Sequence, residues 1–235
     1  MSTFARASVK QGFLDKLYGR IARRYDLVNY VQSLGLVGFM RRDAAAFVGR
    51  GVVLDAGAGS GDLAAACLGA GAARVVCLDR SPEMFAVARA KLASYERAGR
   101  VRFVLGDVAR MPFREGAFDN VGSAFLFRNV PSTDAAVGEV GRVLKAGGRV
   151  AAADVFAPPR GLIGALYKIY LNVMVPLWGR LIARDGLAYR YLSASIQNCF
   201  SGEEFAGRLA AAGFADVRVE AKFFGVAHVV KGRLP

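Results

Sequence analysis

The sequence predicts an α/β fold: a seven-stranded, mostly parallel sheet with an antiparallel last strand, enclosed by helices. Three observations support it. The chain has 235 residues, 54% of them hydrophobic, which is enough for one buried core. From residue 51, short β-rich runs alternate with helical stretches, as is typical of parallel sheets with helices on both faces. Two final apolar runs follow each other around Gly225, which indicates an antiparallel pair at the sheet edge.

The first part of the predicted domain, residues 1–50, is a helical cap. Apolar positions recur at helical spacing between residues 13 and 48, starting with Leu14, Leu17 and Ile21. A core follows over residues 51–157. Its predicted strands are VVLDA, RVVCLD, VRFVLGD, FDNVGSAF and GRVAAADVF, and its predicted helices cover 61–70, 82–98 and 132–145.

Local signals mark the ends of these helices. Ser81 followed by Pro82 is a typical N-cap with proline in the first turn. A cation and two glycines, in the run Lys145-Ala146-Gly147-Gly148, indicate the end of the third core helix before the next strand.

An apolar segment, GLIGALYKIYLNVMVPLWGRLIA, follows two prolines and raises the question of a membrane span. Lys168, Pro176 and Arg180 interrupt it, so we favour an amphipathic helical flap over residues 158–200. Residues 201–235 then complete the fold with a helix near 202–212 and strands at 215–222 and 225–231. We interpret residues 1–235 as a single domain.

Composition limits the classes of function. The net charge of +13 favours an anionic partner, either nucleic acid or an anionic membrane surface, and the hydrophobic content argues against disorder. The three cysteines have no CxxC spacing, which favours free thiols in a reducing compartment over a disulfide scaffold or a metal site. The start of the chain lacks the apolar core of a signal peptide, so we expect a cytoplasmic protein.

A glycine-rich turn carries the strongest local signal. In VLDAGAGSGD an apolar strand ends near Asp55, and Gly57, Gly59 and Gly61 follow at alternate positions as a helix begins. Glycines allow a sharp turn and a close approach to a ligand, while the helix N-terminus offers unpaired N–H groups. The third glycine is one residue too early for a dinucleotide fingerprint.

Two further acids end strands at the same edge. Asp79 follows the second strand, where a carboxylate can accept hydrogen bonds from ribose hydroxyls, and Asp107 follows the third. Alone, Asp79 is equally a solvated turn acid and Asp107 a helix cap. Together with the glycine turn they indicate an adenosine site without a pyrophosphate.

This arrangement resembles the class I S-adenosylmethionine-dependent methyltransferases, whose Rossmann-like sheet also ends in an antiparallel strand. The resemblance implies that the Gly57 to Gly61 turn holds the methionine part of S-adenosyl-L-methionine. It also implies that Asp79 binds the ribose and that Asp107 and Val108 bind the adenine. Asp55, Arg80 and Phe125 complete the expected cofactor-binding set.

Several blocks resemble one subgroup, the C-methyltransferases of ubiquinone and menaquinone biosynthesis. They are IARRYDLVNYVQSLGL, FLFRNV, EVGRVLKAGGR, YRYLSASIQNCF and GVAHVVKG, which together span most of the chain. Phe127, where this subgroup favours isoleucine, and the run DVFAPP depart from its pattern and leave the exact quinone open. The resemblance implies methylation of a polyprenyl hydroquinone. The short N-terminus argues against a mitochondrial enzyme, so we favour demethylmenaquinol, in a prokaryote, over a ubiquinone precursor.

FLFRNV places Arg128 and Asn129 inside an apolar run. A ring carbon becomes nucleophilic when its hydroquinone loses a proton, and a phenol pKa near ~10 leaves little anion at neutral pH. We expect Arg128 to favour the phenolate and Asn129 to orient the same oxygen. Guanidinium keeps its proton, so a water or a carboxylate must accept the phenolic proton, and Asp154, at the end of the fifth strand, is the first choice for that carboxylate.

Other residues have more than one interpretation. Tyr25, Asp26 and Asn29 are expected to close the pocket from the N-terminal helix, with Tyr25 in the catalytic set. Arg128 is alternatively an ion-pair partner that holds a loop, and Asp154 a cap. His228 is expected to be structural, whereas Tyr189, Arg190 and Tyr191 either shape the site or anchor the flap.

Two other classes of function stay open at this point. A nucleic-acid methyltransferase also suits the charge, although FLFRNV is not the Asn/Asp-Pro-Pro-Tyr/Phe type of loop and no basic run with interleaved aromatics occurs. A non-enzymatic ligand sensor or membrane-surface module would keep the cofactor site without turnover. Peripheral contact with an anionic membrane is expected, and the oligomeric state is open.

Overall fold

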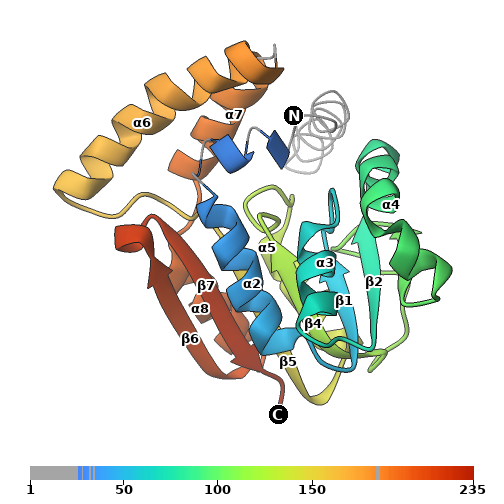
Figure 1. Ribbon diagram of the computed structural model, residues 1–235. Coiled ribbons are helices and arrows are strands. Elements are labelled where there is room, and N and C mark those ends of the chain that lie inside the picture. Colours follow the sequence, from blue (N-terminus) through green and yellow to red (C-terminus); the bar gives the residue numbers. More distant parts are fainter. Residues whose placement is uncertain (1–25, 28, 32, 34, 184–185) are drawn as a thin grey trace, which may run out of the picture.

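The computed structural model describes residues 26–235, apart from 28, 32, 34, 184 and 185. A seven-stranded sheet in the order β3-β2-β1-β4-β5-β7-β6 forms its centre (Figure 1). The strands are β1 Val52–Ala56, β2 Arg74–Asp79, β3 Val101–Leu105, β4 Phe118–Ala124, β5 Leu144–Asp154, β6 Ala215–Lys222 and β7 Ala227–Arg233. Neighbours among β1 to β5 pair in parallel, and β7 is antiparallel to both β5 and β6. The predicted sheet is therefore confirmed.

Helices α2 Leu36–Val48, α3 Asp62–Gly69 and α4 Pro82–Arg97 cover one face of this sheet, and α5 Thr133–Val143 and α8 Gly202–Ala211 cover the other. Two further helices are α6 Leu162–Trp178 and α7 Gly186–Gln197. Because successive strand residues point to opposite faces, Val53 packs under α2, α3 and α4, whereas Leu54 packs with α5 and α8. Burial on both faces explains why the strands are nearly continuous apolar runs.

A side-chain cap fixes the start of α4. The Ser81 hydroxyl accepts a hydrogen bond from the Met84 N–H at 3.1 Å, with Pro82 in the first turn as predicted. The prediction was wrong at the α5–β5 junction: the helix ends at Val143, and the strand already begins at Leu144. The two glycines lie inside the irregular start of this strand. Glycine is required at 148, because a Cβ there would come within 2.8 Å of the carbonyl oxygens of Asp119 and Lys145.

The α6 and α7 helices form a separate layer beside the end of the sheet (Figure 1). A π-helical turn, η1 Gly179–Ala183, follows α6, and Pro176 lies inside the last turn of α6. The layer has its own small core of Leu171, Val175, Tyr189 and Ile196. Another short element, the 3₁₀ turn η2 Phe223–Gly225, joins β6 to β7.

Candidate active site

One cavity lies where β1, β2 and β4 end and the glycine-rich turn begins. It measures about 120 Å³. Its wall brings together eight of the residues that sequence reasoning assigned to the cofactor, namely Asp55, Gly57, Gly59, Asp79, Arg80, Asp107, Val108 and Phe125. The carboxyl ends of parallel strands at a point where strand order reverses are a usual place for a ligand. We call this space the first cavity.

The glycine-rich turn has left-handed backbone where glycine is favoured. Gly57 and Gly59 have φ values of 70° and 51°. A Cβ on Gly57 would lie 2.6 Å from Leu126, whereas one on Gly59 would meet nothing within 4 Å. Gly59 thus leaves its backbone open to a ligand in the first cavity.

Gly61 has a different surrounding and is not among the described residues that line the first cavity. Its φ is 81°, and a Cβ there would come within 2.9 Å of Leu92 on α4. The absence of a side chain at Gly61 therefore allows the start of α3 to pack against α4.

The acids after β2 and β3 hold the turns around the first cavity. The Asp79 carboxylate accepts hydrogen bonds from the N–H groups of Gly59, at 2.8 Å, and Ser81, at 2.9 Å. Arg80 donates to Asp107 at 2.6 Å, and Asp107 also accepts the Ala109 N–H at 2.9 Å. These acids therefore join the chain after β1, β2 and β3 into one wall.

Asp55 is a buried carboxylate with 1% exposure. Among the described residues, neither of its oxygens has a hydrogen-bond partner of good geometry. Burial raises the pKa of Asp55 to about 7, because the anion loses its hydration. A cationic or hydroxyl-bearing ligand in the first cavity would supply the missing partner.

A second cavity, of about 200 Å³, lies between the sheet and the α6–α7 layer. Its walls come from α2, the loop after β4, α6, α7 and the turn between β6 and β7. Apolar residues such as Met40, Leu171 and Ile196 dominate it, and Arg128, Tyr167 and Tyr170 bring polar groups. An apolar space with few polar groups suits a largely hydrophobic ligand.

Phe125 forms part of the wall of both cavities. Its φ is 62°, an uncommon value for an aromatic residue, and its N–H donates to the Ala153 carbonyl at 2.8 Å. The guanidinium carbons of Arg41 and Arg128 lie 5.3 and 5.5 Å from its ring centroid. Strained backbone at the junction of two cavities is typical of functional sites.

Arg128 and Asp154 form a buried ion pair, with side chains 4% and 1% exposed. Arg128 lines the second cavity, whereas Asp154, the last residue of β5, is not among the described residues lining either one. Burial raises the pKa of Asp154, and the nearby Arg128 guanidinium opposes that rise. Asp154 also accepts the Val155 N–H at 2.8 Å.

Asn129 and Tyr25 complete the catalytic set expected from the sequence. The Asn129 amide donates to the Phe125 carbonyl at 3.1 Å, and its residue lines the first cavity rather than the second. Tyr25 lies outside the described residues. The structure therefore brings Arg128 and Asp154 together and places Asn129 behind the strained Phe125 turn.

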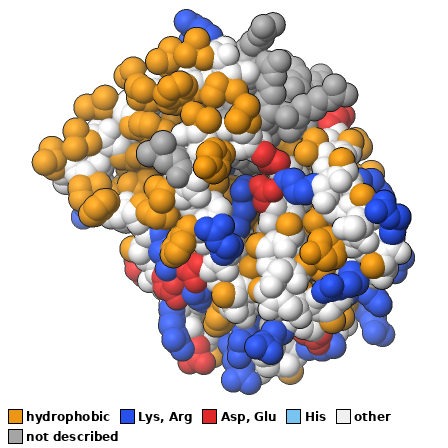
Figure 2. Space-filling model, viewed as in Figure 1, with side chains coloured by type: hydrophobic (Ala, Val, Ile, Leu, Met, Phe, Trp, Pro, Cys, Tyr) orange, Lys and Arg blue, Asp and Glu red, His pale blue; other side chains and the backbone are white. Residues whose placement is uncertain are grey.

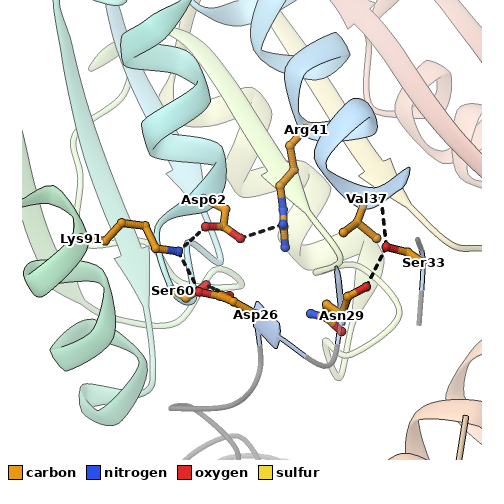
Figure 3. Close-up of polar contacts among 8 residues, drawn as sticks. All are labelled: Asp26, Asn29, Ser33, Val37, Arg41, Ser60, Asp62 and Lys91. Carbon is orange, nitrogen blue, oxygen red and sulfur yellow. Dashed lines mark hydrogen bonds and ion pairs between the residues drawn. The ribbon is translucent and has the colours of Figure 1, made fainter. Parts of the chain in front are cut away.

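The N-terminal segment is attached to the glycine-rich turn by charged side chains (Figure 3). Asp26 accepts a hydrogen bond from the Ser60 hydroxyl at 2.5 Å and pairs with Lys91 at 2.8 Å. Lys91 also pairs with Asp62, whose other oxygen lies 2.7 Å from Arg41. The polar cluster of Asp26, Arg41, Ser60, Asp62 and Lys91 thus links α2, α3 and α4 beside the first cavity.

Of the other residues noted in the sequence, His228, Tyr189 and Tyr191 pack against neighbouring elements, whereas Asn29 reaches a cavity wall. His228, in β7, pairs in register with Asp154, and its ring lies 5.8 Å from that of Phe156. Tyr189 is 1% exposed in the core between α6 and α7, and Tyr191 packs against that core. Asn29 lines the second cavity.

A model of the ubiE/COQ5 methyltransferase family matches residues 6–233. The chain belongs to this family. A demethylmenaquinone methyltransferase from Thermus thermophilus is 40% identical over 223 residues, covering 93% of this chain and all of that protein. A ubiquinone/menaquinone biosynthesis C-methyltransferase from Desulfotalea psychrophila is 34% identical, covering 90% of this chain and 86% of that protein.

Solved structures agree on the fold. The [4+2]-cyclase SpnF has a TM-score of 0.60 at 17% identity, and the match covers 84% of this chain and 79% of the SpnF chain. A methyltransferase from Thermotoga maritima has a TM-score of 0.59 at 17% identity, and the match covers 94% of this chain and 99% of the Thermotoga chain. Membership of the ubiE/COQ5 family makes the chain an S-adenosylmethionine-dependent methyltransferase.

The first cavity fits the cofactor of this family. Asp55 offers a buried carboxylate, without a hydrogen-bond partner of good geometry among the described residues, to a cationic ligand, and Gly59 leaves space beside its backbone. When bound, S-adenosyl-L-methionine supplies an electrophilic methyl group on a sulfonium. The described residues of the first cavity would hold it through acids and backbone groups.

Some residues at and beside the cavities of this family member were not found from its sequence. Arg41 and Lys91 lie in helical stretches where no spacing distinguishes them from the other basic residues. Tyr167 and Tyr170 did carry a signal, because two tyrosines three residues apart in an apolar helix share one face.

Proposed function

We propose that this chain transfers a methyl group to a ring carbon of a polyprenyl hydroquinone, converting demethylmenaquinol to menaquinol. The observation that carries the proposal is the apolar second cavity, which contains the buried Arg128 side chain and meets the first cavity at Phe125. A hydroquinone in the second cavity would face the methyl donor across that residue.

The Arg128 guanidinium is proposed to stabilise the hydroquinone as its anion. Removal of a phenolic proton raises the electron density of the ring carbons, and a permanent cation in a water-poor cavity favours that anion strongly. In the ligand-free state the Asp154 carboxylate balances this charge. The phenolate would share Arg128 with Asp154 as it forms. After the ring carbon has gained the methyl group, it would lose its hydrogen as a proton, which restores the aromatic ring, and the phenolic oxygen would regain a proton.

Asp154 is the proposed proton acceptor. Its raised pKa means that it takes up a proton more readily than an exposed carboxylate, and protonation would weaken its hold on Arg128 just when the phenolate needs that cation. Because Asp154 lies behind Arg128, a water or a shift of the Arg128 side chain must connect it to the substrate oxygen.

Arg128→Met tests this role. The variant should lose turnover by about 10²-fold or more while cofactor affinity changes little, because the charge acts mainly in the transition state. Arg97→Met, an exposed arginine in the last turn of α4, is the matched control and should retain normal turnover. Near-normal turnover of Arg128→Met at neutral pH would exclude the electrostatic role.

The identity of the quinone is supported by relatives. The proteins from Thermus thermophilus and Deinococcus radiodurans carry the name demethylmenaquinone methyltransferase, at 40% and 35% identity. The alternative is a ubiquinone precursor, because other relatives are named for both pathways. Incubation with methyl-labelled S-adenosylmethionine and each precursor, followed by mass spectrometry of the lipid quinones, distinguishes the two substrates.

We further propose that the chain works in the cytoplasm, at the inner face of the membrane that holds its substrate. A polyprenyl tail keeps the hydroquinone in the bilayer, so the second cavity must meet its substrate at a lipid surface. The net charge of +13 suits an anionic leaflet.

A further inference from the structure

Helix α6 is apolar on two opposite sides. Its inner side, with Leu171 and Val175, packs into the α6–α7 core and is buried. The outer side carries large apolar residues at spacings of three or four, which places them along one face of the helix. These residues are Leu162, Leu166, Ile169, Val173 and Leu177, and each is between 42% and 75% exposed.

We call this row the α6 outer face, and it is unusual for a surface helix. A helix at a protein surface normally turns a polar side to water. Figure 2 shows hydrophobic side chains gathered over the α6 region, in the upper left of the view. Contiguous exposed apolar surface of this kind marks an interaction site.

Phe224 adds a second exposed apolar group near the start of α6. Its side chain is 85% exposed, and its φ of 59° follows a φ of 51° at Phe223. A left-handed backbone at two successive aromatic residues is strained, so the turn presents Phe224 to solvent at a cost. The next residue, Gly225, lies close to Pro159, just before α6.

Charge around this surface has one predominant sign. The sequence from 158 to 200 contains the cations Arg160, Lys168, Arg180, Arg184 and Arg190 and a single acid, Asp185. Arg160, Lys168 and Arg180 are exposed. Apolar residues with flanking cations are the composition of helices that lie in the interface of anionic membranes.

We propose that the α6 outer face and Phe224 dock the protein on the surface of an anionic lipid bilayer. This inference rests on the proposed function, because a substrate held in a bilayer is the reason for choosing a bilayer as the partner. The bilayer is favoured over a second copy of the chain because the surrounding cations would face each other in a symmetric dimer, whereas anionic headgroups neutralise them.

The same elements form the wall of the second cavity. The other sides of α6 contribute Tyr167, Tyr170 and Val175, and the Phe224 turn contributes Phe223 and Val226. A bilayer on the α6 outer face would thus lie one helix thickness from the second cavity. The tail of a hydroquinone would pass between α6 and the Phe224 turn.

Docking flat on the surface agrees with the packing of α6 better than spanning does. Among the described residues, one helical stretch, Leu162–Ile182, is long and apolar enough to cross a membrane, with a mean hydropathy of 1.3. Its inner side, however, packs against α7 and lines a cavity. Lys168 and Arg180 also suit an interfacial position better than a hydrocarbon core.

The test is co-sedimentation of the full chain, without cofactor or substrate, with vesicles of phosphatidylcholine alone or mixed with phosphatidylglycerol. We expect binding to the mixed vesicles that weakens as salt rises, because screening reduces the attraction to headgroups. The triple variant Leu166→Gln, Ile169→Gln, Val173→Gln should bind about tenfold or more weakly, since it removes buried apolar area.

Two single variants sharpen the test. Phe224→Asn should weaken vesicle binding about threefold or more while the fold is retained, since asparagine tolerates the left-handed backbone. Leu105→Gln removes an exposed leucine at the end of β3, the opposite edge of the sheet, and should bind vesicles like the wild type. Calorimetric binding of S-adenosylmethionine verifies that each variant is folded.

Several outcomes would overturn the proposal. The first is that the wild-type protein stays in the supernatant with the mixed vesicles. The second is that the triple variant sediments with vesicles as well as the wild type does. The third is that the wild-type protein is a dimer and the triple variant is not. Protein that resists extraction by salt and alkaline carbonate would indicate a span instead. Turnover on a short-tailed hydroquinone in buffer, measured separately, tests the proposed methylation without any vesicle.

Discussion

At the scale of single residues, Asp79 already holds backbone N–H groups, and a cofactor would add further contacts to it. Its oxygens hold the Gly59 and Ser81 N–H groups, so the same carboxylate fixes the glycine-rich turn and faces the first cavity. Asp79→Ala should weaken S-adenosylmethionine binding by about 1.5–3 kcal/mol, the range for a hydrogen bond to a charged group. Isothermal titration calorimetry measures this loss.

Asp79→Asn is the matched variant, because its amide oxygen still accepts one backbone N–H. We expect an affinity between those of the wild type and Asp79→Ala. Equal affinity of all three proteins would mean that Asp79 contributes nothing to the cofactor site.

Asp55 leads to a pH-dependent prediction. Its folded pKa of about 7 lies above the usual 3.8, so the folded state holds a proton that the unfolded state has lost in this window. Stability of the ligand-free protein should therefore fall as pH rises from about 4 to 7. Asp55→Asn should stabilise it by a few kcal/mol at pH 8 and much less at pH 4, as measured by urea denaturation.

Cofactor binding should respond in the opposite sense. The Asp55 anion that costs stability is the form that attracts a cationic ligand, so affinity for S-adenosylmethionine should rise between pH 6 and pH 8 by about threefold or more. Asp55→Asn should remove that rise. A pH-independent affinity in the wild type would show that Asp55 stays protonated or does not face the cofactor.

At this scale, residue type and position together were enough to predict which residues would lie near one another. A glycine after a strand or an acid at a strand end indicates a ligand site, and most of these residues do line the first cavity, whereas their binding roles stay predictions. The surroundings of Gly61 and Asn129 could not be predicted in this way. Gly61 packs against Leu92, which is distant in sequence, and the Asn129 amide donates to the Phe125 carbonyl only because the chain makes an unusual turn there.

At the scale of elements, the polar cluster ties the N-terminal segment to α3 and α4. Lys91 is the centre, because it bridges Asp26 and Asp62. Lys91→Met should weaken S-adenosylmethionine binding by about 0.5–1 kcal/mol, since the ion pairs are partly exposed and screened by water. Titration calorimetry at low and high salt measures the loss, which should shrink as salt rises.

The control for this element is Lys145→Met. Lys145 also pairs with a carboxylate, that of Asp119 at 2.6 Å, and is not among the described residues that line the first cavity. Its replacement should leave cofactor affinity unchanged. If both variants lost affinity equally, the effect would come from net charge and not from the polar cluster.

Periodicity was sufficient for strands and most helices because their burial follows a regular pattern. Every strand of the parallel part was identified, since a strand buried on both faces is a short apolar run with breakers at its ends. The α5–β5 junction was missed because glycines normally end helices, whereas here Gly148 allows β5 to approach the carbonyl oxygens of Asp119 and Lys145. That requirement is tertiary and leaves no local pattern.

At the scale of the whole molecule, the second cavity was beyond prediction from sequence. Its wall draws on α2, the loop after β4, α6, α7 and the turn after β6. Nothing local relates Met40 to Ile196 or Phe223, because only the folded sheet brings these segments to one place. The family resemblance supplied the chemistry, and the fold supplies the space for it.

Because Phe125 belongs to both cavities, we predict that ligands in the two cavities favour each other. A cofactor product that orders the Phe125 turn removes part of the cost of ordering it for the second ligand. S-adenosylhomocysteine should therefore raise the affinity for a short-tailed hydroquinone by about fivefold or more, and the hydroquinone should raise affinity for S-adenosylhomocysteine by the same factor. Calorimetric titrations in both orders measure the two factors.

Phe125→Leu should reduce this coupling toward unity, because leucine keeps an apolar wall but loses the ring that contacts Arg41 and Arg128. Phe127→Leu is the matched control. Phe127 is 2% exposed, packs against Phe205 in the other core and is not among the described residues lining either cavity. The Phe127→Leu variant should lower the free energy of unfolding but leave the coupling factor between the two ligands unchanged. Equal coupling in the wild type and Phe125→Leu would mean that the two cavities communicate through other residues or act independently.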